Sequence, residues 1–245
     1  MARFHRVMVK LSGGALAGGS GFGFDRAALE HIVGEILSVR ELGVEMAIMV
    51  GGGNIFRGNM ADDWGIERAE ADNIGATATV INSLMLRGAL TARGAGDVRV
   101  MTAIPMNAVA EPYIRLRSIH HMEKGRLLIF AAGTGQPYIT TDYPAVQRAL
   151  ETRCDVIFAA KNGAPGVCTA DPNLEPTARR FTTLPYEEVL TRNLKVMDQA
   201  AFLLAKEYRL PLYVFDFAEK QAMRRICEGE DVGTLIADGL PVQFA

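Results

Sequence analysis

The sequence predicts an α/β fold, a three-layer sandwich with a mostly parallel central sheet. Short runs of β-branched and other apolar residues recur along the chain, without the polar alternation that is typical of half-exposed strands. Stretches with helical periodicity separate these runs, and strands that alternate with helices favour a parallel sheet covered on both faces. The predicted strands span residues 7–11, 44–50, 98–104, 127–132, 155–160 and 211–216.

The segment between the first two strands is predicted to be a helix. Asp25 is suited to its N-cap, Leu29, Ile32 and Val33 begin an apolar stripe at helical spacing, and Gly43 ends it. No linker, low-complexity tract or internal repeat divides the chain, so residues 1–245 are predicted to form a single domain. Similar patterns predict helices over 72–93, 143–152, 198–208 and 218–228.

Composition excludes several classes of partner. The formal net charge is −2 and no block of basic residues interrupts it, so we expect no nucleic-acid partner. No apolar run is long enough to cross a membrane and no secretory leader is recognisable, so we expect no membrane partner and a cytoplasmic location. Cys154, Cys168 and Cys227 match no zinc-ligand spacing, which predicts reduced thiols and no protein metal site.

The loop after the first predicted strand carries phosphate-binding chemistry. Ligands of open α/β sheets bind beyond the carboxyl ends of the strands, so these loops are the places to look for a site. In "KLSGG", the ammonium of Lys10 and the backbone N–H groups around Ser12 and Gly13 suit phosphate oxygens. The alternatives are a surface lysine and, for the glycines in 18–23, a flexible surface hairpin.

The loop after the second predicted strand combines glycines with an arginine. In "GGGNIFRG", the glycines at 51–53 allow a ligand to approach the backbone, and Arg57 offers two parallel donors to a phosphate. A plain tight turn with a surface arginine would explain the same residues.

Two further loops follow later strands. In "AAGTGQPYITTD", threonines and Gln136 offer hydrogen bonds, and Tyr138 and Ile139 suit one wall of a base site. The alternative for Asp142 is a simple N-cap, which is also the prediction for Asp198 before the helix at 198–208. In "AAKNGAPGVCTADP", Lys161 and its neighbours suit a second nucleotide, although the prolines fit a structural loop equally.

In this order and at these separations, the four loops resemble the bacterial uridylate kinases, a family within the amino acid kinase superfamily. The motifs that carry the resemblance are "KLSGG", "GGGNIFRG", "TGQPYITTD", "TADP", "NLKVMDQAAFLLAKEYRLPLYVFD" and "GTLI". The resemblance runs from about residue 5 to 238 and implies an amino acid kinase-like fold. The segments "EPYIRLRSIHHMEKGR" and "VQRALE" are most similar to the actinobacterial branch.

The resemblance implies transfer of the γ-phosphoryl group of ATP to UMP with Mg²⁺, in pyrimidine nucleotide biosynthesis and usually in a homohexamer. It implies an acceptor-binding half at about 1–150 and an ATP-binding half at about 151–245. Lys10 and Lys161 would face the phosphates, and Asp142 would orient the two lysines, since phosphoryl transfer needs positioning of the reactants and neutralisation of phosphate charge. The implied ATP-binding residues are Lys10, Leu11, Ser12, Gly13, Gly53, Arg57, Asn162, Cys168 and Asp171. The implied UMP-binding residues are Gly52, Arg57, Asp72, Thr134, Gly135, Gln136, Pro137, Tyr138, Ile139, Thr140 and Thr141.

The chain departs from the family pattern at a few positions. Gly14 stands where a glutamate is usual, Pro165 where an aspartate is usual, and Cys168 where an aromatic residue is expected against adenine. The segment 73–78 also lacks the usual bulky residues. These departures leave two alternatives open: a divergent paralogue that phosphorylates another small acceptor, and a non-catalytic nucleotide-binding regulatory protein.

Overall fold

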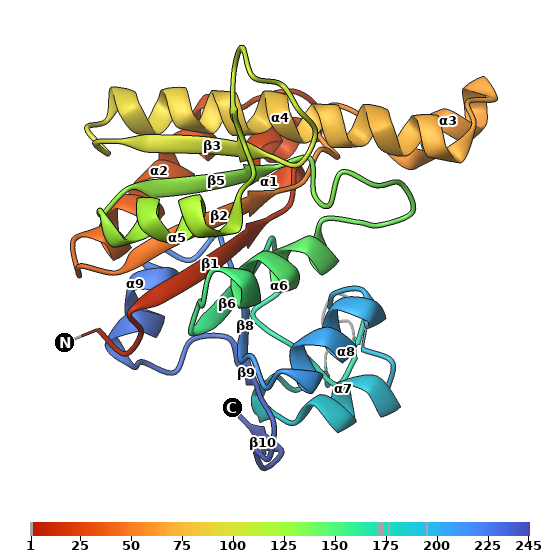
Figure 1. Ribbon diagram of the computed structural model, residues 1–245. Coiled ribbons are helices and arrows are strands. Elements are labelled where there is room, and N and C mark those ends of the chain that lie inside the picture. Colours follow the sequence, from red (N-terminus) through yellow and green to blue (C-terminus); the bar gives the residue numbers. More distant parts are fainter. Residues whose placement is uncertain (1, 171–173, 176, 195) are drawn as a thin grey trace.

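The computed structural model describes residues 2–170, 174–175, 177–194 and 196–245, and strands and helices alternate along most of them (Figure 1). The strands are β1 (Arg6–Leu11), β2 (Glu45–Val50), β3 (Val98–Thr102), β4 (Glu111–Pro112), β5 (Leu127–Ala131), β6 (Val156–Lys161), β7 (Phe181–Leu184), β8 (Leu212–Asp216), β9 (Thr234–Ile236) and β10 (Gln243–Phe244). The helices are α1 (Gly14–Ala17), the 3₁₀ turn η1 (Gly18–Ser20), α2 (Arg26–Arg40), α3 (Gly58–Trp64), α4 (Arg68–Ala92), α5 (Arg115–Glu123), α6 (Asp142–Glu151), α7 (Tyr186–Thr191), α8 (Gln199–Glu207) and α9 (Ala222–Glu228).

The strands described above form one sheet in the order β10-β7-β9-β8-β6-β1-β2-β5-β3-β4. Neighbouring strands run parallel from β8 to β4, whereas β9 is antiparallel to β8 and β10 is antiparallel to β7. The predicted mostly parallel sheet is therefore confirmed. Because β1, β2, β5 and β6 are parallel neighbours, the loops that follow them leave the sheet at one edge.

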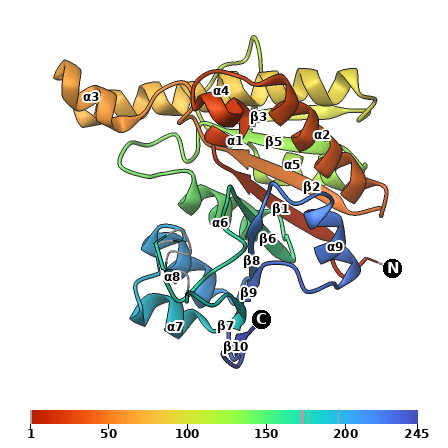
Figure 2. The same cartoon turned by 180° about the vertical axis from the view of Figure 1, so that it is seen from behind.

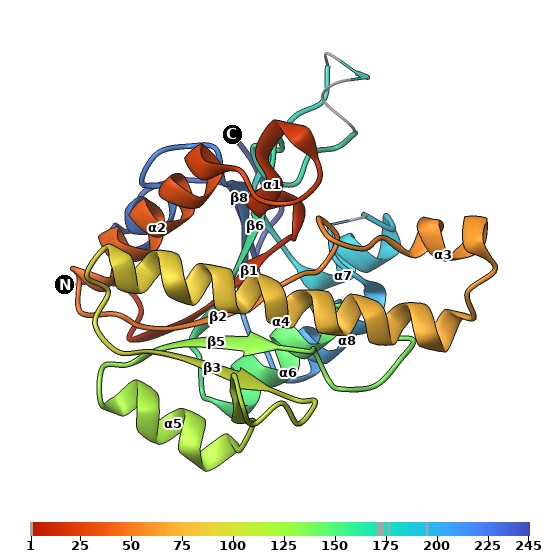
Figure 3. The same ribbon diagram turned by 90° about the horizontal axis from the view of Figure 1, so that it is seen from above.

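Helices cover both faces of the sheet. The helices α2, α4 and α9 pack on one face, and α5, α6 and α8 pack on the other, as Figures 1 and 2 show from opposite sides. Seen from above, α4 crosses the sheet next to α2 (Figure 3). Within the described part of the chain, no helix has the length and apolar character needed to cross a membrane.

Side-chain alternation in β1 shows how the two cores are divided. Val7, Val9 and Leu11 lie in the core under α2, α4 and α9, whereas Met8 lies in the core under α6 and α8. Successive side chains of a strand point to opposite faces, so Lys10 shares the face of Met8 and points toward α6. This parity places a buried lysine on the side of the sheet where Asp142 begins α6.

The six predicted strands and five predicted helices are present, with shifted ends. The helix predicted at 72–93 already begins at Arg68, and the one predicted at 218–228 begins only at Ala222. The sequence reading missed the elements whose apolar signal is weak or short: β4, β7, β9, β10, α3, α5 and α7. Helix α5, for example, has the polar sequence RLRSIHHME and buries only one side of it.

The glycine-rich segment 18–23 is not a surface hairpin, so that alternative was wrong. The chain forms η1 there, directly after α1, and the N–H of Gly23 then donates to the carbonyl oxygen of Asn54 at 2.8 Å. The N-cap predicted at Asp25 is confirmed, because its carboxylate accepts the N–H of Ala28 at 2.7 Å.

Two glycines near the C-terminus allow a test of close packing in the "GTLI" segment. Gly233 and Gly239 have nearly equal positive φ angles of 69° and 68°. A Cβ on Gly233 would overlap the carbonyl oxygen of Val214 and lie 2.7 Å from the Cβ of Phe215, whereas one on Gly239 would meet nothing within 4 Å.

We therefore expect Gly239→Ala to lower the free energy of unfolding by about 1 kcal/mol, the cost of a left-handed alanine. Gly233→Ala should cost about 2 kcal/mol more, because β8 must move. Urea unfolding of both variants measures the difference, and equal losses would contradict this packing.

Candidate active site

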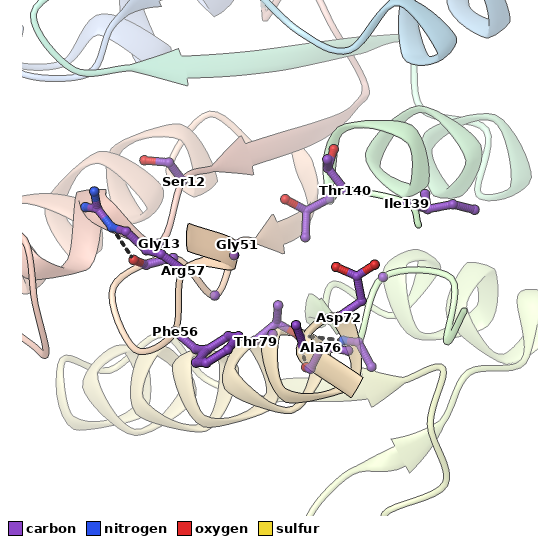
Figure 4. A pocket seen from close by; sticks show the side chains of 18 of the residues that line it. Ser12, Gly13, Gly51, Phe56, Arg57, Asp72, Ala76, Thr79, Ile139 and Thr140 are labelled. Carbon is purple, nitrogen blue, oxygen red and sulfur yellow. Dashed lines mark hydrogen bonds between the residues drawn. The ribbon is translucent and has the colours of Figure 1, made fainter. Parts of the chain in front are cut away.

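A cavity of about 570 Å³ lies at the edge of the sheet where β1, β2 and β5 end, a volume typical of small-molecule sites. Figure 4 shows residues from four parts of the chain around it: Ser12 and Gly13, the Gly51–Arg57 loop, α4, and the loop after β5. The lining residues are Lys10, Ser12, Gly13, Gly14, Gly51, Gly52, Gly53, Phe56, Arg57, Gly58, Ala71, Asp72, Gly75, Ala76, Thr79, Ala132, Gly133, Thr134, Gln136, Ile139, Thr140 and Thr141.

The ammonium of Lys10 forms a buried ion pair with Asp142 at the inner end of this cavity. Their side chains are only 11% and 12% exposed, so the surface-lysine alternative for Lys10 was wrong. Helix α6 begins at Asp142 and its N-cap residue is Thr141, so Asp142 is not a simple N-cap. Its other carboxylate oxygen, Oδ2, accepts the backbone N–H of Asp198 at 3.2 Å.

Lys161 ends β6 beside this pair. Burial lowers the pKa of Lys161 below the ordinary lysine value, and repulsion from Lys10 lowers it further, while Asp142 and Asp198 act in the opposite direction. Lys10 and Lys161 thus lie close enough to repel each other in a region that is partly shielded from water. An anion between them would relieve this repulsion and raise the pKa of Lys161.

Each of the two glycine loops contains a position that has no room for a side chain. A Cβ on Gly13 would lie 2.6 Å from the backbone nitrogen of Gly53, and a Cβ on Gly52 would lie 2.6 Å from the carbonyl oxygen of Gly75 on α4. Among the small residues at 73–78, Ala78 has a packing reason, because its Cβ already lies 3.0 Å from where a Cβ on Gly52 would be, whereas a Cβ on Gly75 would meet nothing within 4 Å. Gly14 has no such reason, since its Cβ would meet only the Ser12 hydroxyl, at 3.8 Å.

Arg57 lies at the rim of the cavity and is exposed. Its Nε donates to the carbonyl oxygen of Gly53 at 2.9 Å, and an Nη atom makes a longer 3.4 Å bond to that of Gly21. In Figure 4 its guanidinium is directed toward the Ser12 side, away from Asp72. In this orientation both hydrogen bonds of the guanidinium go to backbone carbonyls.

The loop after β5 is fastened to α4 at two points. Ala132, which has a positive φ of 61°, donates its N–H to the hydroxyl of Thr79 at 2.7 Å. The carboxylate of Asp72 accepts the N–H of Tyr138 at 2.7 Å and two 3.0 Å bonds from Arg68. Asp72 is thus already engaged by protein donors.

The predicted acceptor-side residues are only partly gathered at the cavity. Ile139 lines it, but Tyr138 is 67% exposed and, with Gly135 and Pro137, is not among the described lining residues. Sequence reasoning missed the lining residues Phe56 and Thr79. A helical i, i+3, i+4 signal was available in Asp72, Gly75, Ala76 and Thr79, which share one face of α4.

Asp198 differs from its predicted role. It occupies the N-cap position of α8, but its side chain makes no capping hydrogen bond. Its carboxylate instead accepts the hydroxyl of Thr140, while its N–H donates to Asp142. Asp198 therefore joins α8 to both the loop after β5 and the ion pair.

The described residues of the fourth predicted loop, up to position 170, are not among those that line the cavity. Thr234 of the "GTLI" segment accepts the N–H of Val167 at 2.9 Å, and a Cβ on Gly166 would lie 2.6 Å from the same hydroxyl. Cys168 is half-buried and forms a β-bridge with Arg180. Asn162 is exposed next to Lys161, and Asp171 lies outside the described residues. The nucleotide contacts of Asn162, Cys168 and Asp171 remain predictions.

The model of the amino acid kinase family matches residues 5–216, most of the chain, and the chain belongs to that family.

Relatives that are similar over nearly the whole chain are uridylate kinases. The chain is 59% identical to a uridylate kinase of Frankia alni over 96% of this chain and 92% of that protein. It is 47% identical to a uridylate kinase of Nocardioides sp. over 98% of this chain and all of that protein. The structure is similar to the crystal structure of UMP kinase from Bacillus anthracis, with a TM-score of 0.96, 56% identity and 99% coverage of both chains.

Proposed function

We propose that the protein is a UMP kinase, a phosphotransferase that moves the γ-phosphoryl group of ATP to UMP and forms UDP and ADP. The observation that carries the proposal is the buried Lys10–Asp142 pair, with Lys161 beside it, where two glycine loops meet at the edge of the sheet. Near-full-length similarity to uridylate kinases supports the same activity.

The chemistry suits these residues. Phosphoryl transfer requires that the two oxygens of the exchange be held in line and that phosphate charge be neutralised. Lys10 and Lys161 supply positive charge at the transferring group, and Asp142 keeps Lys10 in place without accepting a proton. The N–H groups around Gly13 and Gly53 add donors that need no reorganisation during transfer.

The acceptor would lie along the cavity toward α4. Its phosphate meets Gly52 and Arg57, its ribose meets Asp72, and its base lies along Thr134–Thr141. The phosphates of ATP lie against residues 10–13 and Gly53, and Asn162, Cys168 and Asp171 border the rest of the nucleotide. Residues up to about 150 thus form the acceptor-binding half of one domain, and the remainder forms the ATP-binding half.

Mg²⁺ would accompany ATP. Among the described residues, no three metal-ligating side chains form a group, and the carboxylates of Asp72 and Asp142 are already engaged by protein donors. Mg²⁺ commonly keeps several waters and is held largely by substrate phosphates, which fits such a site. When bound, the ion neutralises charge on the phosphates.

We propose that the enzyme acts in the cytoplasm and catalyses a step of pyrimidine nucleotide biosynthesis. Burial raises the pKa of the Cys154 and Cys227 thiols to about 12, so both stay protonated and unreactive at neutral pH. Such inert thiols agree with a reducing compartment.

The activity is tested by an acceptor panel in a coupled ADP-release assay, with and without Mg²⁺. UMP should be the preferred acceptor over CMP, other monophosphates, carbamate and carboxylates, and turnover should need Mg²⁺. Lys10→Met should lower kcat by roughly 100-fold or more, because one preorganised charge is lost, and Lys124→Met, on the exposed surface, should match the parent. Binding of UMP without turnover would support a regulatory protein, and a different best acceptor would support a divergent paralogue.

We also propose a homohexamer, as the resemblance implies. Apolar side chains that are well exposed on a single chain give it surfaces for other copies: Ile81 and Met85 lie one turn apart on α4, and Leu116 lies on α5. Sedimentation velocity should show one species of about six times the chain mass of 26.6 kDa. A monomer at micromolar concentration would exclude the hexamer.

A further inference from the structure

Two fully buried asparagines lie directly behind the glycine loops. Asn54 follows Gly53, Asn82 lies in the middle of α4, and both are 0% exposed. Neither belongs to the cavity lining. Burial of two primary amides is costly unless their polar atoms are paired, so the pair needs an explanation.

The two side chains pair with each other and with two backbone carbonyls. Asn82 Nδ2 donates to Asn54 Oδ1 at 2.7 Å, and Asn54 Nδ2 donates to Asn82 Oδ1 at 3.1 Å. The second N–H of Asn82 donates to the carbonyl oxygen of Gly51 at 2.6 Å, and that of Asn54 donates to Gly23 at 2.7 Å. Because both outer partners are carbonyl acceptors, neither amide can flip without losing a bond.

This pair connects the parts of the chain that surround the phosphate region. Asn82 ties α4 to the start of the Gly51–Gly53 turn, and Asn54 ties the end of that turn to the segment before α2. Asn54 Oδ1 would lie 2.6 Å from a Cβ on Gly13, so the pair also packs against the loop that follows Lys10.

We infer that Asn54 and Asn82 are positioning residues for phosphoryl transfer, which set the directions of the N–H groups of Gly13, Gly52 and Gly53 toward the phosphates. The inference rests on the proposed kinase function. Donors to a developing charge must lie about 2.7–3.1 Å from it, and a misplacement of about 1 Å can cost roughly 100-fold in rate. The pair acts through the glycine turn and leaves substrate contacts intact.

The test compares Asn82→Leu and Asn82→Asp with Ser83→Ala. Ser83 is the matched control: it is the next residue of α4, it is 0% exposed, and its hydroxyl bonds only within the helix, to the carbonyl of Thr79 at 2.7 Å. We expect kcat of the folded Asn82→Leu enzyme to fall about 10- to 100-fold, with the KM values for ATP and UMP changed less than about threefold. Ser83→Ala should keep the parent kcat, whatever it does to the thermal midpoint.

Asn82→Asp adds a pH signature that a purely structural role would not give. The ionised carboxylate of this variant has no donor for Gly51 or Asn54, whereas the protonated acid regains one, and burial favours the protonated form. The ratio of the variant's kcat to that of the parent should therefore rise as the pH falls. This variant also carries the test if Asn82→Leu does not accumulate as a folded protein.

The outcomes separate this inference from the proposed function. Absence of UDP formation by the parent enzyme would overturn the function, whereas an active parent with equally active Asn82 variants would overturn the positioning role. Amide hydrogen exchange across residues 50–56 gives a readout that does not depend on the acceptor. Exchange there should accelerate in both Asn82 variants and not in Ser83→Ala, and unchanged exchange would overturn the inference.

Discussion

The buried ion pair between Lys10 and Asp142 is the interaction on which the rest of the site depends. Removing two charges from water is expensive, and a buried pair repays that cost only with good geometry and additional hydrogen bonds. Asp142 has such support from the backbone N–H of Asp198, whose own carboxylate holds Thr140. The Asp142 carboxylate thereby joins the end of β1 to the starts of α6 and α8. The Asp198 carboxylate adds the loop after β5 through Thr140.

Strand register explains why two lysines share this place. In the parallel pairing of β1 and β6, Lys10 lies opposite Ala159, so Lys161 is one side-chain repeat farther along the same face. In the pairing of β1 and β2, Lys10 lies opposite Met49, so both glycine loops leave the sheet together. The two lysines and the two glycine loops therefore lie together at this edge of the sheet.

Much of the fold could be predicted because its signals are local. Continuous apolar strands and amphipathic helices revealed the sheet, and polar loops after the strands revealed where the site lies. The contacts of Asp142, Asp198 and Thr79 depend on which side chains meet across the sheet edge. The capping pattern predicted a simple N-cap for Asp198 and left an N-cap open as the alternative for Asp142. The asparagine pair was equally hidden, since Asn82 is a polar residue in a helix with no sequence signal that it pairs with Asn54, 28 residues away.

We propose that Lys161, which is half-buried, acts as a second cation beside Lys10, and burial holds its pKa below that of an ordinary lysine. The dependence of kcat/KM on pH reports the ionisable groups of the free enzyme. Comparing this dependence between the parent and Lys161→Arg tests the role of Lys161. Lys161 loses its proton at a lower pH than an exposed lysine does. The kcat/KM of the parent should therefore begin to fall at a pH below the ordinary lysine pKa. The guanidinium of Lys161→Arg stays charged, so its decline should move to higher pH. The same alkaline limb in both enzymes would contradict the account.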